Sequence, residues 1–258
     1  MSIFHKGEII QGIIHPSGPG GGQASEERNW SLLFSLINWK RLNGPIQNTE
    51  LLLIKEVKEK QLDKYMDNLE PYDIIKVSVE FPEAKEDNNT CKLIKVISYQ
   101  DSDNELSAIA AELKKPVIVE DDFFNKLYYN RSFNNWETKI EFNGEAANLI
   151  LEADNNNSFE NSKKFAKQIL KNHKKWEKNI QDFAVSKLLK LKNDTWLDEE
   201  EEKVSAQEFI DKMKVESVIM FHDGEFEFFY NDGDLFWGHS IQIRGNIKKG
   251  LDDADIVG

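Results

Sequence analysis

The last forty or so residues constrain the fold most, because short apolar runs alternate there with tight turn signals. The runs Ser217–Phe221, Phe226–Tyr230 and Phe236–Ile243 are separated by Asp223-Gly224 and by Asn231–Asp234, which are turn-forming sequences. Strands joined by such short turns run antiparallel, since a parallel pair needs a crossover of a dozen or more residues. We therefore predict an antiparallel meander at the carboxyl end of the chain.

The length of 258 residues predicts two domains, because single domains usually hold roughly 100 to 200 residues. Hydrophobic residues make up 40% of the chain, which is enough to build real cores. A polar stretch at Asp101–Glu105 begins the expected linker, and Pro116 closes it. We place the boundary near residue 115, with a small β-rich domain over 1–115 and an α+β domain over 116–258.

The first domain reads as strands, one helix and further strands. Apolar runs at Ile9–Ile14, Glu50–Ile54, Ile74–Val79 and Leu93–Ile97 predict strands, and Glu56–Leu69 has the spacing of an amphipathic helix. This order is typical of a small five-stranded barrel of the oligonucleotide-binding type. The likeness concerns architecture only, since such barrels host many functions.

The segment Trp30–Trp39 fits both helical and strand periodicity. Trp30, Leu33, Phe34 and Ile37 follow a helical spacing, whereas alternate residues from Trp30 to Leu36 follow a strand spacing. We favour a strand, which would complete the barrel, and the helix stays as the alternative.

The second domain places helices between strands. Asn143-Gly144 is a favoured hairpin turn between two apolar runs. Phe159–Lys192 has an apolar stripe opposite ten lysines, and it forms one long helix or two helices joined near His173. Ser205–Glu208 is a capping box that begins a short helix. We predict helices packed on an antiparallel sheet, and hence an α+β fold.

Charge and cysteine content exclude several classes of protein. The net charge of -13 opposes attraction to nucleic acid or to anionic lipid. The chain has no apolar run long enough to span a membrane, and its first residues lack the apolar stretch of a secretory signal. Cys91 is the only cysteine and lies in a strand-like run, where a thiol usually packs as a small apolar group. We expect a cytoplasmic protein that binds neither membranes nor, on charge grounds, nucleic acid.

Two histidines in the meander are the only candidates for metal chemistry. If the strands holding His222 and His239 pair, both rings and a turn aspartate such as Asp223 could meet at one ion, as in a metal-dependent hydrolase. His222 begins a turn, however, and His239 follows a glycine, so structural roles are the favoured interpretation. The sequence contains no recognisable nucleophile elbow, HExxH motif or calcium loop. We therefore predict no catalytic residue and no cofactor.

Surface recognition is the leading functional hypothesis. In Phe236-Trp237 the two side chains point in opposite directions in a strand, so one aromatic ring remains at the surface. The predicted contact surface consists of Trp237, the turn aspartates and the acidic run: Trp237, Asp232, Asp234, Glu199 and Glu200. The expected partner is another protein of basic character, such as a toxin neutralised by an immunity protein. The alternative is single-stranded nucleic acid stacked on Trp30 and Trp39 of the barrel.

Three segments carry a resemblance to a known family: Asn193–Trp196, Phe236–Ile241 and Ala254–Gly258. With the Phe-x-Gly-His-x-Ile signature, the chain from about residue 120 to 258 resembles the bacterial family catalogued as domain of unknown function 2262. The resemblance implies a bacterial intracellular protein of α+β type without an established activity, so it supplies no catalytic residues. The first half is similar to the small β-rich domain that often precedes this family.

Overall fold

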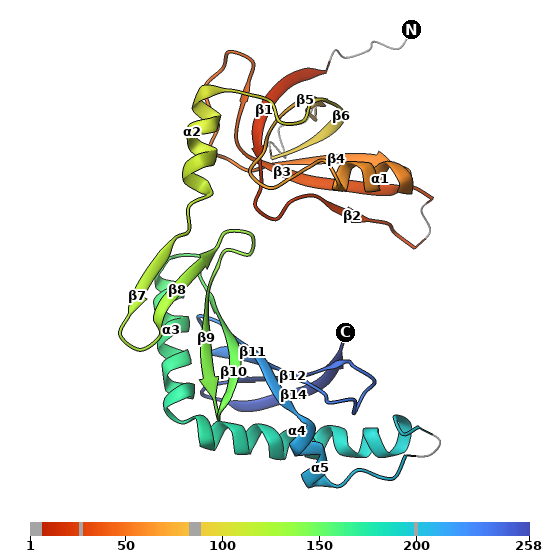
Figure 1. Ribbon diagram of the computed structural model, residues 1–258, viewed down its shortest axis with the longest axis vertical. Helices are drawn as coiled ribbons and strands as arrows, with labels where there is room; N and C mark the ends of the chain where they lie inside the picture. The colour runs from red at the N-terminus through yellow and green to blue at the C-terminus, as the bar shows by residue number, and fades with distance from the viewer. Residues whose placement is uncertain (1–6, 26–27, 83–88, 199–200) are drawn as a thin grey trace. The chain divides into compact units, whose positions relative to one another are not determined.

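The structure is a computed structural model that describes residues 7–25, 28–82, 89–198 and 201–258. The chain divides into two compact units, Met1–Pro116 and Val117–Gly258. Figure 1 shows strands in both units and long helices in the second alone. Each unit has its own hydrophobic core.

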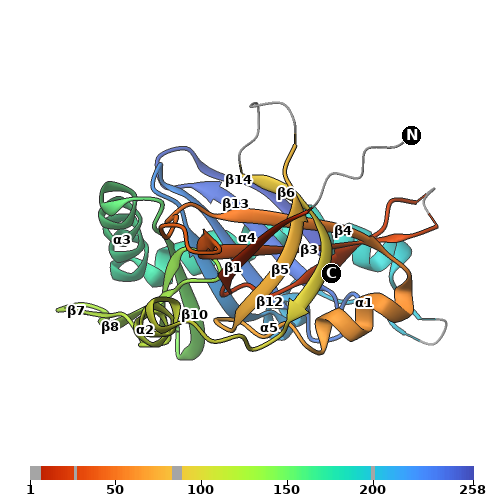
Figure 2. The same ribbon diagram turned by 90° about the horizontal axis from the view of Figure 1, so that it is seen from above.

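The N-terminal unit is a closed five-stranded barrel (Figures 1 and 2), as predicted. Its strands follow one another around the barrel in the order β1-β5-β6-β4-β3, and β3 pairs with β1 to close the circle. Only β4 and β6 run parallel among these pairs. The strands are β1 (Glu8–Ile14), β3 (Trp30–Arg41), β4 (Leu51–Val57), β5 (Ile74–Glu80) and β6 (Thr90–Ser98), and the short β2 (Gly20–Gly22) adds to β3 outside the circle.

The segment with two possible periodicities, Trp30–Trp39, is a strand. Leu32, Phe34 and Leu36 are buried, while the residues between them are only partly covered. Burial of every second residue is the pattern of a strand with one face in the core. The preference for a strand is therefore confirmed.

Two helices complete the N-terminal unit. Helix α1 (Glu59–Met66) lies between β4 and β5 and directs Leu62 into the barrel core. A Cβ atom on Gly21 would lie 2.6 Å from a methyl carbon of Leu62, so a larger residue at this position of β2 would require the Leu62 side chain to move. Helix α2 (Asn104–Leu113) follows the barrel and begins at Asp103, whose side chain accepts hydrogen bonds from two backbone N–H groups of the first turn.

The C-terminal unit is an eight-stranded sheet with the order β14-β13-β12-β11-β10-β9-β8-β7. The pair β10–β11 is parallel and the other pairs are antiparallel. The parallel pair arises because three helices intervene between these strands and return the chain to the same end. The strands are β7 (Ile118–Asp121), β8 (Asn125–Asn130), β9 (Asn135–Phe142), β10 (Glu145–Glu152), β11 (Lys214–Met220), β12 (Glu225–Asn231), β13 (Ser240–Asn246) and β14 (Gly250–Val257).

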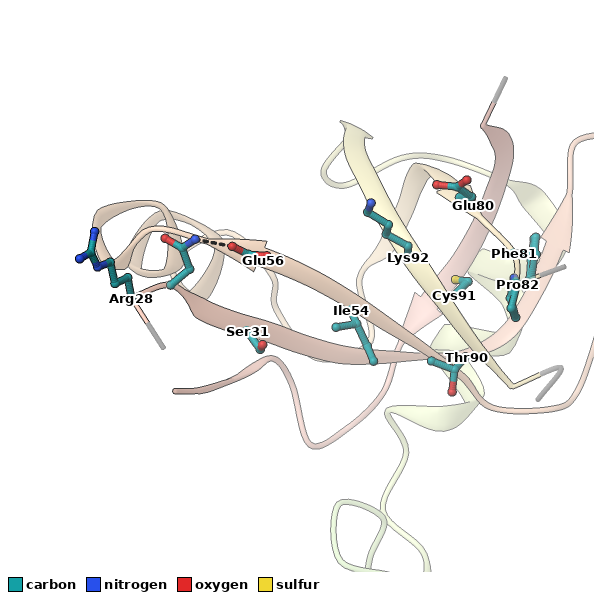
Figure 3. A pocket seen from close by; sticks show the side chains of 11 residues that line it. Arg28, Ser31, Ile54, Glu56, Glu80, Phe81, Pro82, Thr90, Cys91 and Lys92 are labelled. Carbon is teal, nitrogen blue, oxygen red and sulfur yellow. Dashed lines mark hydrogen bonds between the residues drawn. The ribbon is translucent and has the colours of Figure 1, made fainter. Parts of the chain in front are cut away.

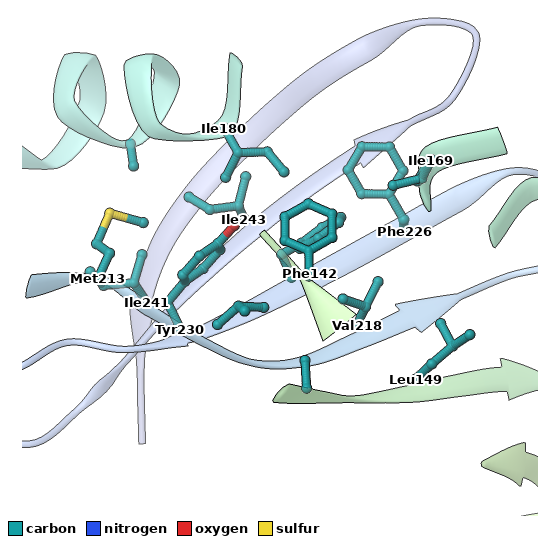
Figure 4. Packing of buried hydrophobic residues seen from close by; sticks show 14 of the residues in the cluster. Phe142, Leu149, Ile169, Ile180, Met213, Val218, Phe226, Tyr230, Ile241 and Ile243 are labelled. Carbon is teal, nitrogen blue, oxygen red and sulfur yellow. The ribbon is translucent and has the colours of Figure 1, made fainter. Parts of the chain in front are cut away.

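The intervening helices are α3 (Asn156–Lys171), α4 (His173–Thr195) and α5 (Ala206–Lys212). The helical region contains two helices, which meet at Asn172, rather than one. The predicted capping box of α5 is present, since Ser205 and Glu208 bond reciprocally. The helices and the sheet enclose one core in which Ile180 of α4 lies near the aromatic and aliphatic side chains of the strands (Figure 4).

The predicted strand Phe236–Ile243 is shorter than expected. Strand β13 begins only at Ser240, and the residues from Asp232 to His239 form a turn. Trp237 and Gly238 have left-handed backbone angles, which a strand does not accommodate. This turn holds most of the candidate site.

Candidate functional site: the loop between β12 and β13

The loop from Asp232 to His239 has an unusual backbone. Gly233 (φ 56°), Asp234 (φ 66°), Trp237 (φ 57°) and Gly238 (φ 85°) all adopt positive φ. Glycine and aspartate tolerate this region, whereas a bulky tryptophan does so rarely and at an energetic cost. Such a conformation persists only where surrounding contacts fix it.

The carboxylate of Asp232 provides those contacts. It accepts hydrogen bonds from the backbone N–H groups of Phe236 (2.5 Å) and Gly238 (3.3 Å) through one oxygen and of Asp234 (3.2 Å) through the other. Only 1% of Asp232 is exposed. Its carboxylate therefore faces the backbone of its own loop, which corrects the prediction that it belongs to a contact surface.

Trp237 projects from the loop, and its neighbour Phe236 anchors it. Phe236 is fully buried and contacts the rings of Trp196 and Phe209, at centroid distances of 5.6 and 6.0 Å. Trp237 is 57% exposed and has one ring contact, to Trp196 at 4.7 Å. The loop thus exposes a large aromatic side chain to the solvent, and Asp234 of the same loop is also exposed.

The acidic segment after α4 is tied to the end of that helix. Lys192 is fully buried, and its Nζ donates to the carbonyl of Trp196 (2.9 Å) and to Glu201 (2.7 Å). The hydrogen bond from Lys192 lowers the pKa of the Glu201 carboxyl. Glu201 is thus engaged within the unit, while the predicted contact residues Glu199 and Glu200 lie outside the described residues.

The two histidines of the meander lie at opposite ends of β12. His222 precedes this strand and His239 follows it, and seven strand residues span about 20 Å. The ring of His222 bonds to Glu152 (2.5 Å), which raises the pKa of the imidazole, and the ring of His239 lies 2.7 Å from the carbonyl of Phe236. Their convergence on one ion, the alternative considered from sequence, is therefore wrong.

No other group of three acidic, histidine or cysteine side chains within the described part of the chain is arranged to hold a metal. Cys91 is buried, and burial raises the pKa of its thiol to about 12. At neutral pH this thiol is protonated and a poor nucleophile. Within the described ranges, no helix has the length and apolar character needed to cross a membrane.

One of the two tryptophans considered as a stacking platform on the barrel is buried. Trp39 is 5% exposed, packs in the barrel core and contacts Phe81 at 5.9 Å. Trp30 is partly buried against the same core. Since base stacking requires an exposed aromatic face, Trp39 is unsuited to the role that the nucleic-acid alternative gave it.

A groove on the barrel was missed from the sequence. It encloses about 920 Å³ and extends from Arg28 to Pro82 (Figure 3). The groove exists because β4 and β6 stop pairing, and no local sequence pattern encodes where strands stop pairing. The polar segment after β5 was the one sequence feature that indicated an interruption between the strands. The lining residues are Arg28, Asn29, Ser31, Ile54, Glu56, Glu80, Phe81, Pro82, Thr90, Cys91 and Lys92.

Comparison with known families agrees with the division of the chain. The model for an uncharacterized protein conserved in bacteria (DUF2262) matches residues 121–256, and a domain of unknown function (DUF7021) matches residues 4–113. No curated protein matches the chain. Because the first match covers more than half of the 258 residues, the chain belongs to the DUF2262 family.

Proposed function

We propose that this member of the DUF2262 family is a non-enzymatic protein-interaction module, which contacts its partner through Trp237 and the loop that carries it. Tryptophan is the residue type most enriched at the energetic centres of protein interfaces. The observation that carries the proposal is the exposed ring of Trp237 on a loop fixed by the buried Asp232. The bacterial origin of the family is compatible with an immunity-type role.

Preorganisation strengthens the proposal. A flexible aromatic side chain loses conformational entropy when it is immobilised at an interface, and this loss lowers affinity. In this loop the backbone on both sides of Trp237 donates to Asp232, at Phe236 and at Gly238. The conformational entropy of the loop is therefore already lost on folding. Binding does not have to offset this loss, so the contact area of the ring contributes fully to affinity.

The charge of the chain favours a basic partner. The net charge is -13, and Asp234 is exposed in the same loop as Trp237. Complementary charge increases the rate of association and suppresses wrong partners. Capture of a basic toxin, in the manner of an immunity protein, is the most specific form of the proposal.

The two alternatives have weaker support. A metal-dependent hydrolase would need His222 and His239 at one ion, and they lie at opposite ends of β12. Single-stranded nucleic acid would need exposed aromatic rings on the barrel, and Trp39 is buried. Neither alternative has an observation comparable to the exposed Trp237.

The test is quantitative affinity purification from a bacterium that encodes this chain, with three baits compared by mass spectrometry. The baits are the wild type, Trp237→Ala and the matched control Phe133→Ala, which removes another exposed aromatic ring of the same unit (74% exposed). We expect a basic protein to be recovered with the wild type and with Phe133→Ala. Its recovery should fall at least tenfold with Trp237→Ala and should decrease as salt increases.

Two results would count against the proposal. Equal recovery of the same proteins by all three baits would exclude Trp237 as the contact. Recovery of the chain alone, as an inert monomer at low and moderate salt, would argue against a protein partner altogether. Gel filtration and circular dichroism of each bait would establish that the substitutions leave the fold intact.

A further inference from the structure

The barrel has an opening where β4 and β6 stop pairing. These parallel strands are in register only at Leu52–Ile54 and Thr90–Lys92, although β4 continues to Val57 and β6 to Ser98. Strand β4 stays paired with β3 up to Val57, and β6 stays paired with β5 up to Ser98. Each strand is therefore paired on its other side, and the two edges separate after Ile54.

The separated edge of β4 has backbone groups directed into the opening. The N–H group of Leu52 donates to the carbonyl of Asn89 on the β6 side, at 2.7 Å. Because backbone direction alternates along a strand, Ile54 and Glu56 present their N–H and C=O groups to the same side. At Glu56 no strand of the described chain continues the ladder.

On the β6 edge, backbone carbonyl groups bond to a side chain because no strand of the described residues pairs with them there. The Nζ of Lys55 donates to the carbonyls of Ile94 (2.7 Å) and Leu93 (3.4 Å). Burial, with a smaller contribution from the charge of Lys92, lowers the pKa of this amine. Lys55 thus bridges the two strands within the opening. The residues before and after it, Ile54 and Glu56, point to the other face of β4 and line the groove.

The groove is long and amphipathic. Figure 3 shows Arg28 and Glu56 toward one end, Ile54 between the ends, and Glu80, Phe81 and Pro82 toward the other. Its volume of about 920 Å³ is near the upper end of the range for ligand sites, about 300–1,000 Å³. An elongated groove of this kind matches an extended chain better than a compact small molecule.

The charges in the groove distinguish between two kinds of extended chain. The charged residues that line the groove balance, with Arg28 and Lys92 as cations and Glu56 and Glu80 as anions. Figure 3 shows Glu56 and Glu80 toward opposite ends of the groove. A nucleic acid carries a phosphate at every step, so its backbone would pass a carboxylate at both ends. A polypeptide has an uncharged backbone and avoids this repulsion.

We propose that the barrel groove binds an extended polypeptide segment, which adds to the free edge of β4 at Glu56 and places an apolar side chain on Ile54. In this mode the main-chain hydrogen bonds supply affinity and alternate side chains supply specificity. The site belongs to the N-terminal unit, whereas Trp237 belongs to the C-terminal unit. It gives the N-terminal unit a binding function of its own.

The test uses phage-displayed random octapeptides panned against the full chain, followed by fluorescence anisotropy with the synthetic form of the enriched peptide. We expect enriched sequences with apolar residues at alternate positions. Binding should weaken at least tenfold with Ile54→Asp and stay unchanged with the matched control Ile97→Asp, an exposed β6 position (43%) that does not line the groove. Trp237→Ala should also leave it unchanged, since that residue belongs to the other unit.

A second measurement keeps the wild-type protein and changes the peptide. N-methylation of alternate backbone amides removes donors needed for strand addition, so one of the two methylation patterns should abolish binding while the other preserves it. Equal binding of both methylated forms, or full affinity for Ile54→Asp, would overturn the proposal. So would tight binding of the oligonucleotide dT12 that displaces the peptide, because it would assign the groove to nucleic acid.

Discussion

The two units treat the edges of their β-sheets differently, because only the sheet of the N-terminal unit closes. The barrel of the N-terminal unit joins β1 to β3 and encloses its own core. The sheet of the C-terminal unit stays open, with β7 and β14 as its edges, and packs helices on one face to form its core. A closed sheet removes its edges, whereas an open sheet has to protect them.

In each unit, side chains satisfy backbone groups that the strand ladder does not. On the edge strand β14 the carboxylates of Asp253 and Asp255 accept from the N–H groups of Ala254 and Ile256, at 3.0 and 2.8 Å. In the barrel Lys55 donates to the carbonyls that face the opening. The two candidate sites lie where strand pairing stops: at the opening of the barrel and at the loop between β12 and β13.

The comparison predicts that buried polar anchors matter most in the open sheet. Lys192→Ala should destabilise the C-terminal unit by about 3 kcal/mol, because Lys192 is fully buried, so its loss leaves a cavity and removes the donor to the carbonyl of Trp196. Lys190→Ala is the matched control, since Lys190 is 89% exposed and should contribute less than about 0.5 kcal/mol. Urea unfolding measures the change, and hydrogen exchange assigns it to α4 and α5; equal effects of the two substitutions would contradict the prediction.

The anchor of the candidate loop should have the next largest effect. Asp232→Ala removes a buried carboxylate whose one short hydrogen bond is from Phe236 (2.5 Å), while the bond from Gly238 is long (3.3 Å). A hydrogen bond to a charged group contributes about 1.5–3 kcal/mol. We expect a loss of about 2 kcal/mol and faster hydrogen exchange across the loop, without a change in the barrel. Asp234→Asn, at an exposed position of the same loop, keeps a residue type that tolerates the positive φ of 66° and should change stability by less than about 0.5 kcal/mol. If exchange in the loop stays slow without Asp232, the loop does not depend on this carboxylate.

The hydrogen bonds of Lys55 across the barrel opening should contribute less to stability. Lys55→Met keeps the aliphatic stem but removes the donor to Leu93 and Ile94, so the N-terminal unit should lose about 1 kcal/mol. Lys95→Met, at an exposed position of β6, is the control and should have little effect. Hydrogen exchange at Leu93 to Ser98 is the direct measurement. Unchanged protection there would show that Lys55 is dispensable.

The smallest effect concerns His222, which is half exposed. Its bond to Glu152 raises the pKa of the imidazole above the ordinary value of 6.5. When the pKa of a group is higher in the folded chain than in the unfolded chain, its protonation stabilises the fold. This contribution is fully present at a pH below the pKa in the unfolded chain, and it disappears as the pH rises through the pKa in the folded chain. Titration by NMR should show a midpoint above 6.5 that falls toward 6.5 in Glu152→Gln; no change in the midpoint would exclude the pairing in solution.

Sequence patterns identified most of the architecture. Periodicity predicted the barrel strands and the helices, and Ser205 and Glu208 located the start of α5 because capping is a local interaction. The parallel pairing of β10 and β11 and the opening between β4 and β6 were not predictable, since strand register is set by contacts distant in sequence.

The candidate loop shows the same limit. The sequence signalled a turn at Asn231–Asp234 and an exposed ring at Phe236-Trp237, because adjacent aromatic residues cannot share one face of a strand. The ring is exposed for a different reason, namely the left-handed backbone at Trp237. The role of Asp232 depends on burial and on bonds to residues four and six positions ahead, which composition does not reveal.

The backbone order parameter of Trp237 in the free chain, measured by 15N relaxation, tests the central claim most directly. The account predicts a value near 0.85, as in rigid secondary structure, because Asp232 fixes the loop on both sides of the residue. A value below about 0.6 would describe a flexible loop. That result would contradict a preformed aromatic anchor, and with it the proposed mode of recognition.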